Sequence, residues 1–302
     1  MARIDLITGF LGAGKTTFVK GYAEWLSRAG QSFCVIENEY GAAGVDGAYL
    51  KDANINVEEL SGGCICCSLK VGFHDAILRL CDFCDRIIVE PSGIFSPDDF
   101  FAVMRSPEVA RRCQIGCAAM VCDVHMTRLD GGALEVFRQE LNAAGIILVS
   151  KTQAAGETEI TRCVDFLREN LLHGTDTPIL TADWQSFADH DYEMISRAAP
   201  VEYDHARIAQ DHAALFSAAT FRPEREYSEV EVSAFLRDLR GQACGEILRV
   251  KGYLNAAEGG SFHVNCTARD TEFARLDQRL PPMLNVIGRG LNRGKIKERL
   301  AF

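Results

Sequence analysis

Short apolar runs alternate with amphipathic stretches along the first part of the chain. Residues 16–28, 134–141 and 160–171 repeat apolar positions three and four apart, which is the spacing of one buried helix face. The runs between these stretches have the length and composition of buried strands. They cover residues 4–7, 32–36, 55–60, 85–90, 115–124, 145–149 and 178–181. Strands that alternate with helices predict a doubly wound, mainly parallel α/β sheet over residues 1–190.

The pattern changes after residue 190. Polar and mixed sequence without sustained periodicity continues to residue 212, and we expect residues 191–212 to link two domains. Beyond this link, helical spacing over 230–239 and 294–300 is interspersed with strand-like runs. These runs cover residues 216–221, 245–254, 261–265 and 285–288. We therefore expect a smaller α+β domain over residues 213–302.

A glycine-rich turn joins the first expected strand to the first expected helix. It reads Gly9-Phe10-Leu11-Gly12-Ala13-Gly14-Lys15-Thr16-Thr17 and fits the phosphate-loop (P-loop) pattern G-x-x-x-x-G-K-S/T. Glycines let backbone N–H groups turn toward phosphate oxygens, and the helix that follows directs its positive end at them. Lys15 would reach the β- and γ-phosphates, and Thr16 would offer a hydroxyl to Mg²⁺, a cation that prefers oxygen ligands. The residues expected to contact the nucleotide here are Gly9, Gly12, Ala13, Gly14, Lys15, Thr16 and Thr17.

Acidic side chains follow two of the expected strands, at the edge of a parallel sheet where ligands bind. Glu37 and Glu39 leave one strand, and Asp46 follows in a glycine-rich loop that can place a carboxylate on Mg²⁺. Glu90 ends another buried strand, the position at which P-loop proteins keep the carboxylate that organises Mg²⁺ and its water. Its length favours contact through a water molecule, and Gly93 would donate a backbone N–H to the γ-phosphate. The residues expected to take part in catalysis are Lys15, Asp46 and Glu90.

Three cysteines stand within four residues directly after two glycines, in Gly62-Gly63-Cys64-Ile65-Cys66-Cys67. Thiolates at such a spacing can converge on one soft or borderline metal such as Zn²⁺. Cys66 and Cys67 are adjacent, so only an irregular loop can bring both to one ion, and the glycines permit such a loop. The spacing predicts a transition-metal site, with redox chemistry as the alternative. His74 is a further candidate ligand of this metal. The alternative is that it is an ordinary surface or core residue near the start of a helix.

The sequence holds 12 cysteines in all, and the remaining ones have the spacing of core residues. Cys81 and Cys84, and then Cys113, Cys117 and Cys122, stand beside apolar residues at helical or strand spacing. We expect reduced, buried thiols there, with a second metal site or an iron–sulfur ligand set as the alternative. The cysteines that stand singly are also expected in the core: Cys34, Cys163, Cys244 and Cys266.

Composition narrows the range of partners. The 302 residues are 47% hydrophobic, enough to bury a large core, and carry a net charge of −10. An acidic chain offers no electrostatic footprint for nucleic acid or for an anionic membrane, so we expect neither as a main partner. The sequence starts without the apolar region of a secretory signal, and no apolar segment reaches the ~20 residues of a membrane span. We therefore expect a cytoplasmic protein.

Taken together, these motifs make the chain resemble the CobW-like metallochaperone GTPases, a branch of the SIMIBI class of P-loop proteins. The likeness rests on residues 9–17, on Glu37-Asn38-Glu39-Tyr40-Gly41 followed by Asp46, and on the C-x-C-C run at residues 64–67. Glu90-Pro91-Ser92-Gly93 and Val286-Ile287-Gly288-Arg289-Gly290-Leu291 extend it toward the C-terminus. It covers almost the whole chain.

This resemblance implies that GTP hydrolysis is coupled to the binding of a transition metal, zinc before cobalt or iron, and to its delivery to a client protein. It also implies that Thr16, Asp46 and Glu90 hold Mg²⁺ directly or through water, with Asp46 and Glu90 in the two nucleotide-sensing switches. The ligands of the transition metal would be Cys64, Cys66 and Cys67, with Glu37 and Glu39 nearby. Related proteins pair across their nucleotides, so a nucleotide-dependent homodimer is among the assemblies that the resemblance implies.

One element departs from the family pattern. Members read guanine with an N-K-x-D-type element, whereas this sequence has Ser150-Lys151-Thr152-Gln153 at that position. We expect Ser150, Lys151 and Gln153 to contact the base, but Gln153 offers guanine one carbonyl oxygen in place of a carboxylate. Losing the charged contact would cost about 1.5–3 kcal/mol of discrimination against adenine. The alternatives are an ATP-using or relaxed-specificity NTPase, a small-molecule kinase, which would leave the C-x-C-C run unexplained, and a redox or iron–sulfur regulatory module.

Overall fold

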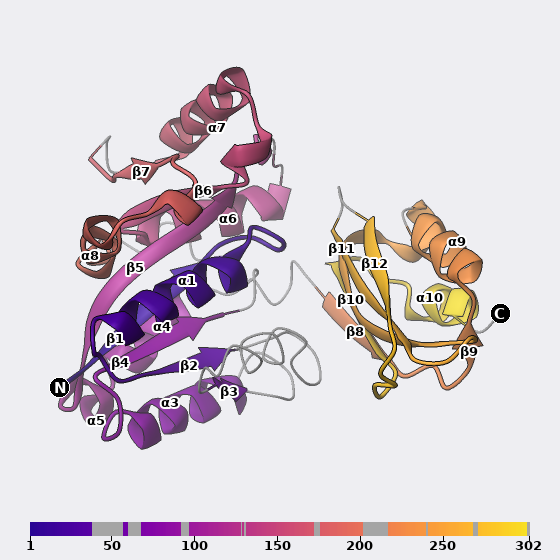
Figure 1. Ribbon diagram of the computed structural model, residues 1–302, viewed down its shortest axis with the longest axis horizontal. Helices are drawn as coiled ribbons and strands as arrows, with labels where there is room; N and C mark the ends of the chain where they lie inside the picture. Colours follow the sequence, from indigo (N-terminus) through magenta and orange to yellow (C-terminus); the bar gives the residue numbers. More distant parts are fainter. Residues whose placement is uncertain are drawn as a thin grey trace. The chain divides into compact units, whose positions relative to one another are not determined.

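The computed structural model describes residues 1–37, 57–59, 68–91, 97–127, 129, 131–171, 176–201, 217–239, 241–267 and 271–300. Within these ranges the chain forms two compact units, one described up to residue 201 and the other from residue 217 (Figure 1). Each unit has its own sheet and its own hydrophobic core.

A seven-stranded parallel sheet organises the first unit, in the order β3-β2-β4-β1-β5-β6-β7. The strands are β1 (Ala2–Thr8), β2 (Phe33–Glu37), β3 (Val57–Glu59), β4 (Arg86–Glu90), β5 (Cys113–Asp123), β6 (Ile146–Ser150) and β7 (Ile179–Leu180). Parallel neighbours need crossover connections, and helices supply them here. The doubly wound parallel sheet expected from the sequence is confirmed.

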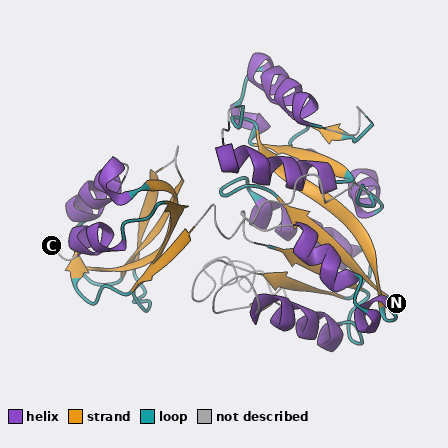
Figure 2. Cartoon of the chain, turned by 180° about the vertical axis from the view of Figure 1, so that it is seen from behind, coloured by secondary structure: helices purple, strands orange, loops and turns teal. Residues whose placement is uncertain are grey.

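Helices cover both faces of this sheet (Figure 2). α1 (Lys15–Arg28) and α8 (Asp189–Ser196) pack on one face, with Phe18, Tyr22 and Ile195 in a shared core. The opposite face is covered by α3 (Ser68–Leu80), α4 (Pro97–Met104), α5 (Pro107–Ala110), α6 (Gly131–Ala143) and α7 (Glu157–Asn170). Because both faces are buried, the strands read as continuous apolar runs. Among the described helices, none combines the length and apolar character that crossing a membrane requires.

A buried ionic network ties the core of the first unit together. Arg86 Nη1 lies 3.1 Å from Asp5 Oδ2, and the Tyr22 hydroxyl donates to the same oxygen at 3.0 Å. Arg86 also donates to the Tyr22 hydroxyl oxygen and, through Nη2, to the Ser196 carbonyl at 3.0 Å. Burial raises the pKa of Asp5, and the Arg86 guanidinium opposes this shift. The network therefore joins β1, β4, α1 and the end of α8.

Residues 191–201 belong to the first unit, so the linker expected over residues 191–212 begins too early. α8 buries the Ile195 side chain completely, and the Val201 N–H donates to the Ala143 carbonyl at 3.3 Å. The helix has only 8 residues, too few for the sequence to display a sustained helical period. The rest of the expected linker lies outside the described residues.

A mostly antiparallel sheet forms the second unit, in the order β12-β11-β10-β13-β8, with β9 paired parallel to β10. The strands are β8 (Ser217–Phe221), β9 (Glu226–Tyr227), β10 (Glu246–Ala256), β11 (Ser261–Thr267), β12 (Thr271–Leu276) and β13 (Met283–Arg289). α9 (Glu229–Leu239) and α10 (Arg293–Leu300) share one core with the apolar side chains of β10, β11 and β13. The smaller α+β fold is confirmed.

The pattern of apolar positions along the chain does not predict β12. This strand lies at the edge of the second sheet, pairs only with β11 among the described strands, and keeps most of its side chains exposed or half-exposed. An edge strand with little burial needs few apolar residues, so its sequence carries a weak strand signal.

Candidate functional site

The P-loop expected from the sequence joins β1 to α1 through glycines with positive φ. Gly9, Gly12 and Gly14 have φ values of 142°, 77° and 98°. A Cβ atom added at Gly9 would lie 2.2 Å from the Val121 carbonyl oxygen, so only glycine fits there. The first turn of α1 carries no acidic residue. The loop therefore keeps a close backbone approach and an uncompensated positive helix end, as phosphate binding requires.

The Lys15 ammonium lies inside this loop. Its Nζ atom donates to the Gly9 carbonyl at 2.8 Å and to the Phe10 carbonyl at 3.4 Å. The side chain is only 6% exposed, so burial and the two carbonyls hold the charge where phosphate oxygens would bind. Thr17, the last residue of the loop motif, is exposed.

Thr16 contacts Glu90 directly. Thr16 Oγ1 at the start of α1 donates a hydrogen bond of 2.7 Å to Glu90 Oε1 at the end of β4. A hydroxyl and a carboxylate are both hard oxygen donors of the kind that Mg²⁺ takes, and this structure brings them together. The donor set therefore fits the magnesium site expected from the sequence.

Acidic residues of three neighbouring strands occupy adjacent register positions at the carboxyl edge of the sheet, here called the carboxylate row. β2 and β4 are paired so that Glu37 lies opposite Glu90, and both side chains are buried, at 3% and 4% exposure. Glu59 in β3 occupies the next register position, opposite Glu37. Neighbouring strands are about 4.8 Å apart, so Glu37 and Glu90 offer oxygen ligands at one place on the sheet edge, as a cation would require. The sequence reading did not single out Glu59.

Glu140 lies beneath the P-loop and was missed in the sequence. Its side chain on α6 is fully buried, and burial raises its pKa to about 8 although the Lys15 ammonium and the Gly9 N–H favour the charged form. The helix pattern held a signal, because Glu140 stands three residues after Phe137 and directly before Leu141, on the apolar face of α6. The Glu140 carboxyl group therefore faces Lys15 and the Gly9 N–H of the P-loop and is shielded from solvent.

The turn after β6 packs against the P-loop from another side. Ser150 Oγ lies 2.6 Å from the Ala13 carbonyl, so this residue supports the loop backbone. Lys151 has a left-handed φ of 60°, and its Nζ atom lies 2.7 Å from Asp123 Oδ2 at the end of β5. Gln153 is exposed on the short 3-10 helix Thr152–Ala154. Of the residues expected to read the base, Ser150 therefore contacts the loop directly, and Lys151 is held by Asp123.

Trp184 is a second neighbour that the sequence reading missed. It begins the 3-10 helix Trp184–Ser186, which follows β7. A Cβ atom added at Gly14 would lie 3.4 Å from Trp184 Cη2, and the indole also packs against the Phe18 ring at a centroid distance of 5.7 Å. The indole thus lines the loop on the side of the expected base-reading turn.

Several predicted site residues lie outside the described residues: Glu39, Asp46, Cys64, Cys66, Cys67 and Gly93. The described elements on either side of the C-x-C-C run are β3 and α3. Within the described ranges, no three His, Cys, Asp or Glu side chains form a metal-binding group. His74 lies within 3.1 Å of Asp75 and 4.0 Å of Glu108 on α5, a helix that leads into the start of β5 at the opposite edge of the sheet.

The cysteine expectations are confirmed in part and wrong in part. The structure pairs Cys34 with Cys84 in a disulfide, so Cys84 is not the reduced, buried thiol expected, whereas Cys34 lies in the core as expected. The parallel pairing of β2 with β4 brings these residues together across 50 positions, which sequence spacing could not indicate. Cys81 is a free thiol as expected but is only half-buried, whereas the other expected core thiols are buried: Cys113, Cys117, Cys122, Cys163, Cys244 and Cys266. Burial raises the pKa of Cys117 well above its usual value, which makes that thiol unreactive.

Comparison with known proteins identifies both units. The sequence model described as CobW/HypB/UreG, nucleotide-binding domain, matches residues 3–171, and that of the cobalamin synthesis protein cobW C-terminal domain matches residues 216–301. The zinc chaperone YjiA of Escherichia coli K12 is 34% identical over 165 residues, which are 52% of this chain and 51% of YjiA. The zinc chaperone YeiR of the same organism is 31% identical over 157 residues, 50% of this chain and 47% of YeiR. The match thus spans about half the length of these curated relatives.

Among solved structures, a crystal structure of the Zn(II)-bound YjiA GTPase from E. coli covers 99% of this chain and 98% of its own. Its sequence identity to this chain is 19%, and the TM-score is 0.46.

Proposed function

Because the chain belongs to the CobW/HypB/UreG family of nucleotide-binding proteins, we propose that it is a metallochaperone which couples GTP hydrolysis to the binding and delivery of zinc. The client would be a protein that needs the metal, and a nucleotide-dependent homodimer is the assembly proposed for the GTP-bound state. Cobalt or iron would be the alternative cargo.

One observation carries this proposal: Glu90 is shared by the two halves of the site. On one side it accepts the 2.7 Å hydrogen bond from Thr16 at the phosphate loop. On the other side it is the register neighbour of Glu37, at the end of the strand that leads toward the predicted metal ligands. Glu37 lies one strand spacing, about 4.8 Å, from Glu90. When nucleotide and Mg²⁺ replace the hydrogen bond between Thr16 and Glu90, the surroundings of Glu37 would therefore change as well.

The described residues support a defined sequence of events at the nucleotide. Phosphate oxygens would replace the Gly9 and Phe10 carbonyls as partners of the Lys15 ammonium. Thr16 and Glu90, together with Asp46, would hold Mg²⁺, which when bound neutralises charge on the phosphates. The Glu90 carboxylate, released from the Thr16 hydroxyl, would orient the attacking water.

The cargo site is proposed from the C-x-C-C run and the carboxylate row. Cys64, Cys66 and Cys67 would supply thiolates, and Glu37 and Glu39 would add carboxylate oxygens, a donor set suited to Zn²⁺. The relatives YjiA and YeiR are named zinc chaperones, which favours zinc over cobalt and iron. Switch segments ordered by the γ-phosphate would assemble this set, and hydrolysis would release it.

We propose a weakened preference for guanine. Lys151, pinned at 2.7 Å to Asp123, would lie along the base, and Gln153 would contact its edge without the carboxylate that guanine N1 and N2 prefer. Trp184 would close the same side of the pocket, because its ring lies against Gly14.

The test is whether nucleotide and metal are linked. Zn²⁺ affinity is measured by competition with a chromogenic chelator, with and without a non-hydrolysable GTP analogue, in the wild type and in T16V. We expect the analogue to change the wild-type affinity by about tenfold, a coupling of ~1.4 kcal/mol, and T16V to abolish this change. The matched control is T161V, since Thr161 is an exposed residue of α7 whose hydroxyl donates to the Glu157 carbonyl of the same helix at 2.9 Å. A wild-type Zn²⁺ affinity that ignores the analogue would refute the proposal.

A further inference from the structure

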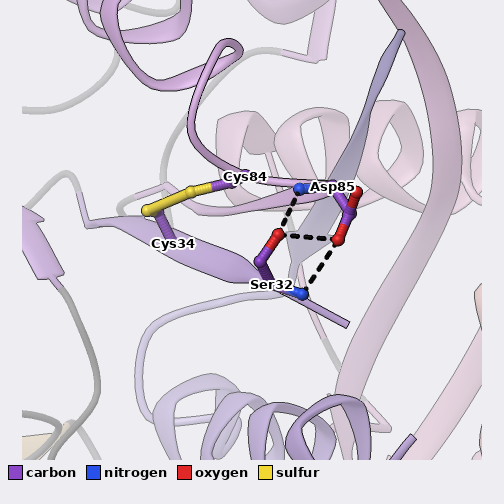
Figure 3. Close-up of a disulfide and its surroundings, with 4 residues drawn as sticks. All are labelled: Ser32, Cys34, Cys84 and Asp85. Atoms are coloured by element: carbon purple, nitrogen blue, oxygen red, sulfur yellow. Dashed lines mark hydrogen bonds between the residues drawn. A yellow bond between two sulfur atoms is a disulfide. The ribbon is translucent and has the colours of Figure 1, made fainter. Parts of the chain in front are cut away.

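A disulfide joins the start of β2 to the connection between α3 and β4. Cys34 is the second residue of β2 and is buried, whereas Cys84 lies four residues after the end of α3 and is half-buried. The two Cα atoms are 6.4 Å apart, and 50 positions separate the residues in the sequence (Figure 3).

Hydrogen bonds between the neighbouring residues hold these two segments together independently of the sulfur atoms. The Asp85 carboxylate accepts from the Ser32 backbone N–H at 3.0 Å and from the Ser32 hydroxyl at 2.6 Å (Figure 3). The Asp85 N–H donates in return to the Ser32 hydroxyl oxygen at 3.0 Å and to the Ser32 carbonyl at 2.9 Å. These bonds lower the pKa of Asp85 and keep it a charged acceptor. The thiols of Cys34 and Cys84 would therefore stay adjacent after reduction. Attack of Cys34 on a mixed disulfide at Cys84 would then be faster than attack by a thiol from solution.

Cys84 is the more exposed cysteine of the pair. It stands between Phe83 and Asp85, both exposed, whereas Cys34 is only 9% exposed. Cys117 and Cys122 are buried, and their pKa values are raised, that of Cys117 by burial and that of Cys122 by a hydrogen bond with the Cys163 thiol and by burial. Thiol exchange needs an accessible thiolate, so it would be selective for Cys84 over these core thiols.

The position of the bond gives it a mechanical effect. β2 is held by β4 on one side and on the other by β3, a strand of only 3 residues. The disulfide fixes the beginning of β2 against the residues before β4, and the register then places Glu37 opposite Glu90 at the far end. Without the covalent bond, only hydrogen bonds and packing hold this strand beside β4.

We propose that Cys34 and Cys84 form a reversible thiol–disulfide exchange site that sets how firmly β2, and with it Glu37, is held beside Glu90. The oxidant is a low-molecular-weight disulfide, RSSR. The Cys84 thiolate attacks one of its sulfurs, forms a mixed disulfide and releases one RS⁻. The Cys34 thiolate then attacks Cys84 Sγ, forms the intramolecular bond and releases the second RS⁻, so two electrons pass from the protein to RSSR and two protons leave the cysteine thiols. Two equivalents of RSH reverse the reaction.

The experiment uses the full chain without nucleotide or metal, so its outcome does not depend on the proposed function. Protein is equilibrated anaerobically at a series of reduced-to-oxidised glutathione ratios, quenched with acid, unfolded and alkylated, and its mass is measured. We expect two of the 12 cysteines to become protected in one step, and peptide mapping to find Cys34 linked to Cys84. The step should be lost in C34S and in C84S. It should survive in C81S, the matched control, because Cys81 lies three positions from Cys84 and is also half-buried.

Hydrogen exchange then measures the mechanical effect. Amides of residues 34–37 should exchange at least about tenfold faster in the reduced protein and in C84S than in the oxidised wild type, while amides of α7 should not change. If C34S does not fold because its side chain is buried, C84S at the accessible position carries the test. Absence of the linked peptide at every glutathione ratio, persistence of the step in C84S, or identical exchange of β2 in both redox states would each overturn the proposal.

Discussion

Thr16 and Glu90 are joined by a 2.7 Å hydrogen bond between the start of α1 and the end of β4. The two residues are 74 positions apart in the sequence, and the bond exists because β4 lies next to β1, the strand that leads into the P-loop. The threonine hydroxyl belongs to the phosphate loop, and the glutamate belongs to the carboxylate row. An ion bound at this point would find oxygen ligands from both residues.

Glu90→Gln should reduce hydrolysis while leaving nucleotide binding intact. Glutamine keeps a carbonyl oxygen that can accept from Thr16, but it removes the charge that orients and polarises the attacking water. We expect turnover to fall by about a hundredfold or more. Phosphate release measures turnover, and a fluorescent nucleotide analogue measures affinity, which should stay within a few-fold of wild type. A turnover within threefold of wild type would rule out this role for Glu90.

Gly9→Ala should destabilise the protein more than Gly30→Ala. Both glycines have positive φ, so both variants carry backbone strain of about 1–2 kcal/mol. At Gly30 a Cβ atom meets nothing within 4 Å, whereas at Gly9 it would lie 2.2 Å from the Val121 carbonyl oxygen. The added clash should cost at least about 1–3 kcal/mol more and weaken nucleotide binding. Urea unfolding measures the difference, and equal midpoints for the two variants would contradict the close approach described at Gly9.

Glu140 should make the protein less stable as the pH rises. Its pKa is raised by burial to about 8 in the folded state, whereas 4.5 is the value for an ordinary glutamate. Between these values the folded state holds a proton that the unfolded chain has released, so the free energy of unfolding falls with increasing pH. Glu140→Gln should flatten this slope and leave the variant more stable than wild type at pH 8.

Unfolding midpoints between about pH 5 and pH 8 measure the effect of Glu140. Glu135→Gln is the matched control on the same helix, since Glu135 is half-exposed and lies 3.5 Å from Arg138. If the unfolding midpoint of the Glu140 variant falls with pH as steeply as that of the wild type, the pH dependence comes from other groups.

Gln153→Asp should sharpen base selection. A carboxylate at this exposed position can accept from both guanine N1 and N2, whereas the amide accepts at one oxygen. We expect the ratio of GTP to ATP affinity to rise about tenfold to a hundredfold, with little change in stability. Competition titrations with both nucleotides provide the measurement. A wild-type protein that already binds GTP about a thousandfold more tightly than ATP would refute the weakened preference.

Local sequence signals sufficed for the P-loop and for most strands of the first unit. The P-loop motif with Gly9, Gly14 and Lys15 lies within one short segment of the sequence. Each parallel strand is buried on both faces, so it is recognised as a continuous run of apolar residues. The carboxylates Glu37 and Glu90 could be placed at one edge because parallel strands all end there.

Other features depend on which strands become neighbours. The pairing of β2 with β4 brings Cys34 to Cys84, and the pairing of β5 with β6 brings Asp123 to Lys151. Glu140 and Trp184 reach the P-loop only through the packing of α6 and of the turn after β7. Periodicity along the chain contains none of this information, because contacts across a sheet depend on strand order.

The hydrogen bond from Arg86 to the Ser196 carbonyl spans 110 positions of the chain and has a consequence for synthesis. While the polypeptide is being made, β1, β4 and α1 emerge from the ribosome long before α8, yet the guanidinium buried among them lacks one acceptor until α8 arrives. A fragment that stops at residue 190 would lack the Ser196 carbonyl, so one N–H group of the buried Arg86 guanidinium would have no acceptor there. A buried donor without its acceptor destabilises the folded state by roughly 1–3 kcal/mol. The hydrogen bonds of the first unit can therefore be complete only after residue 196 has been translated.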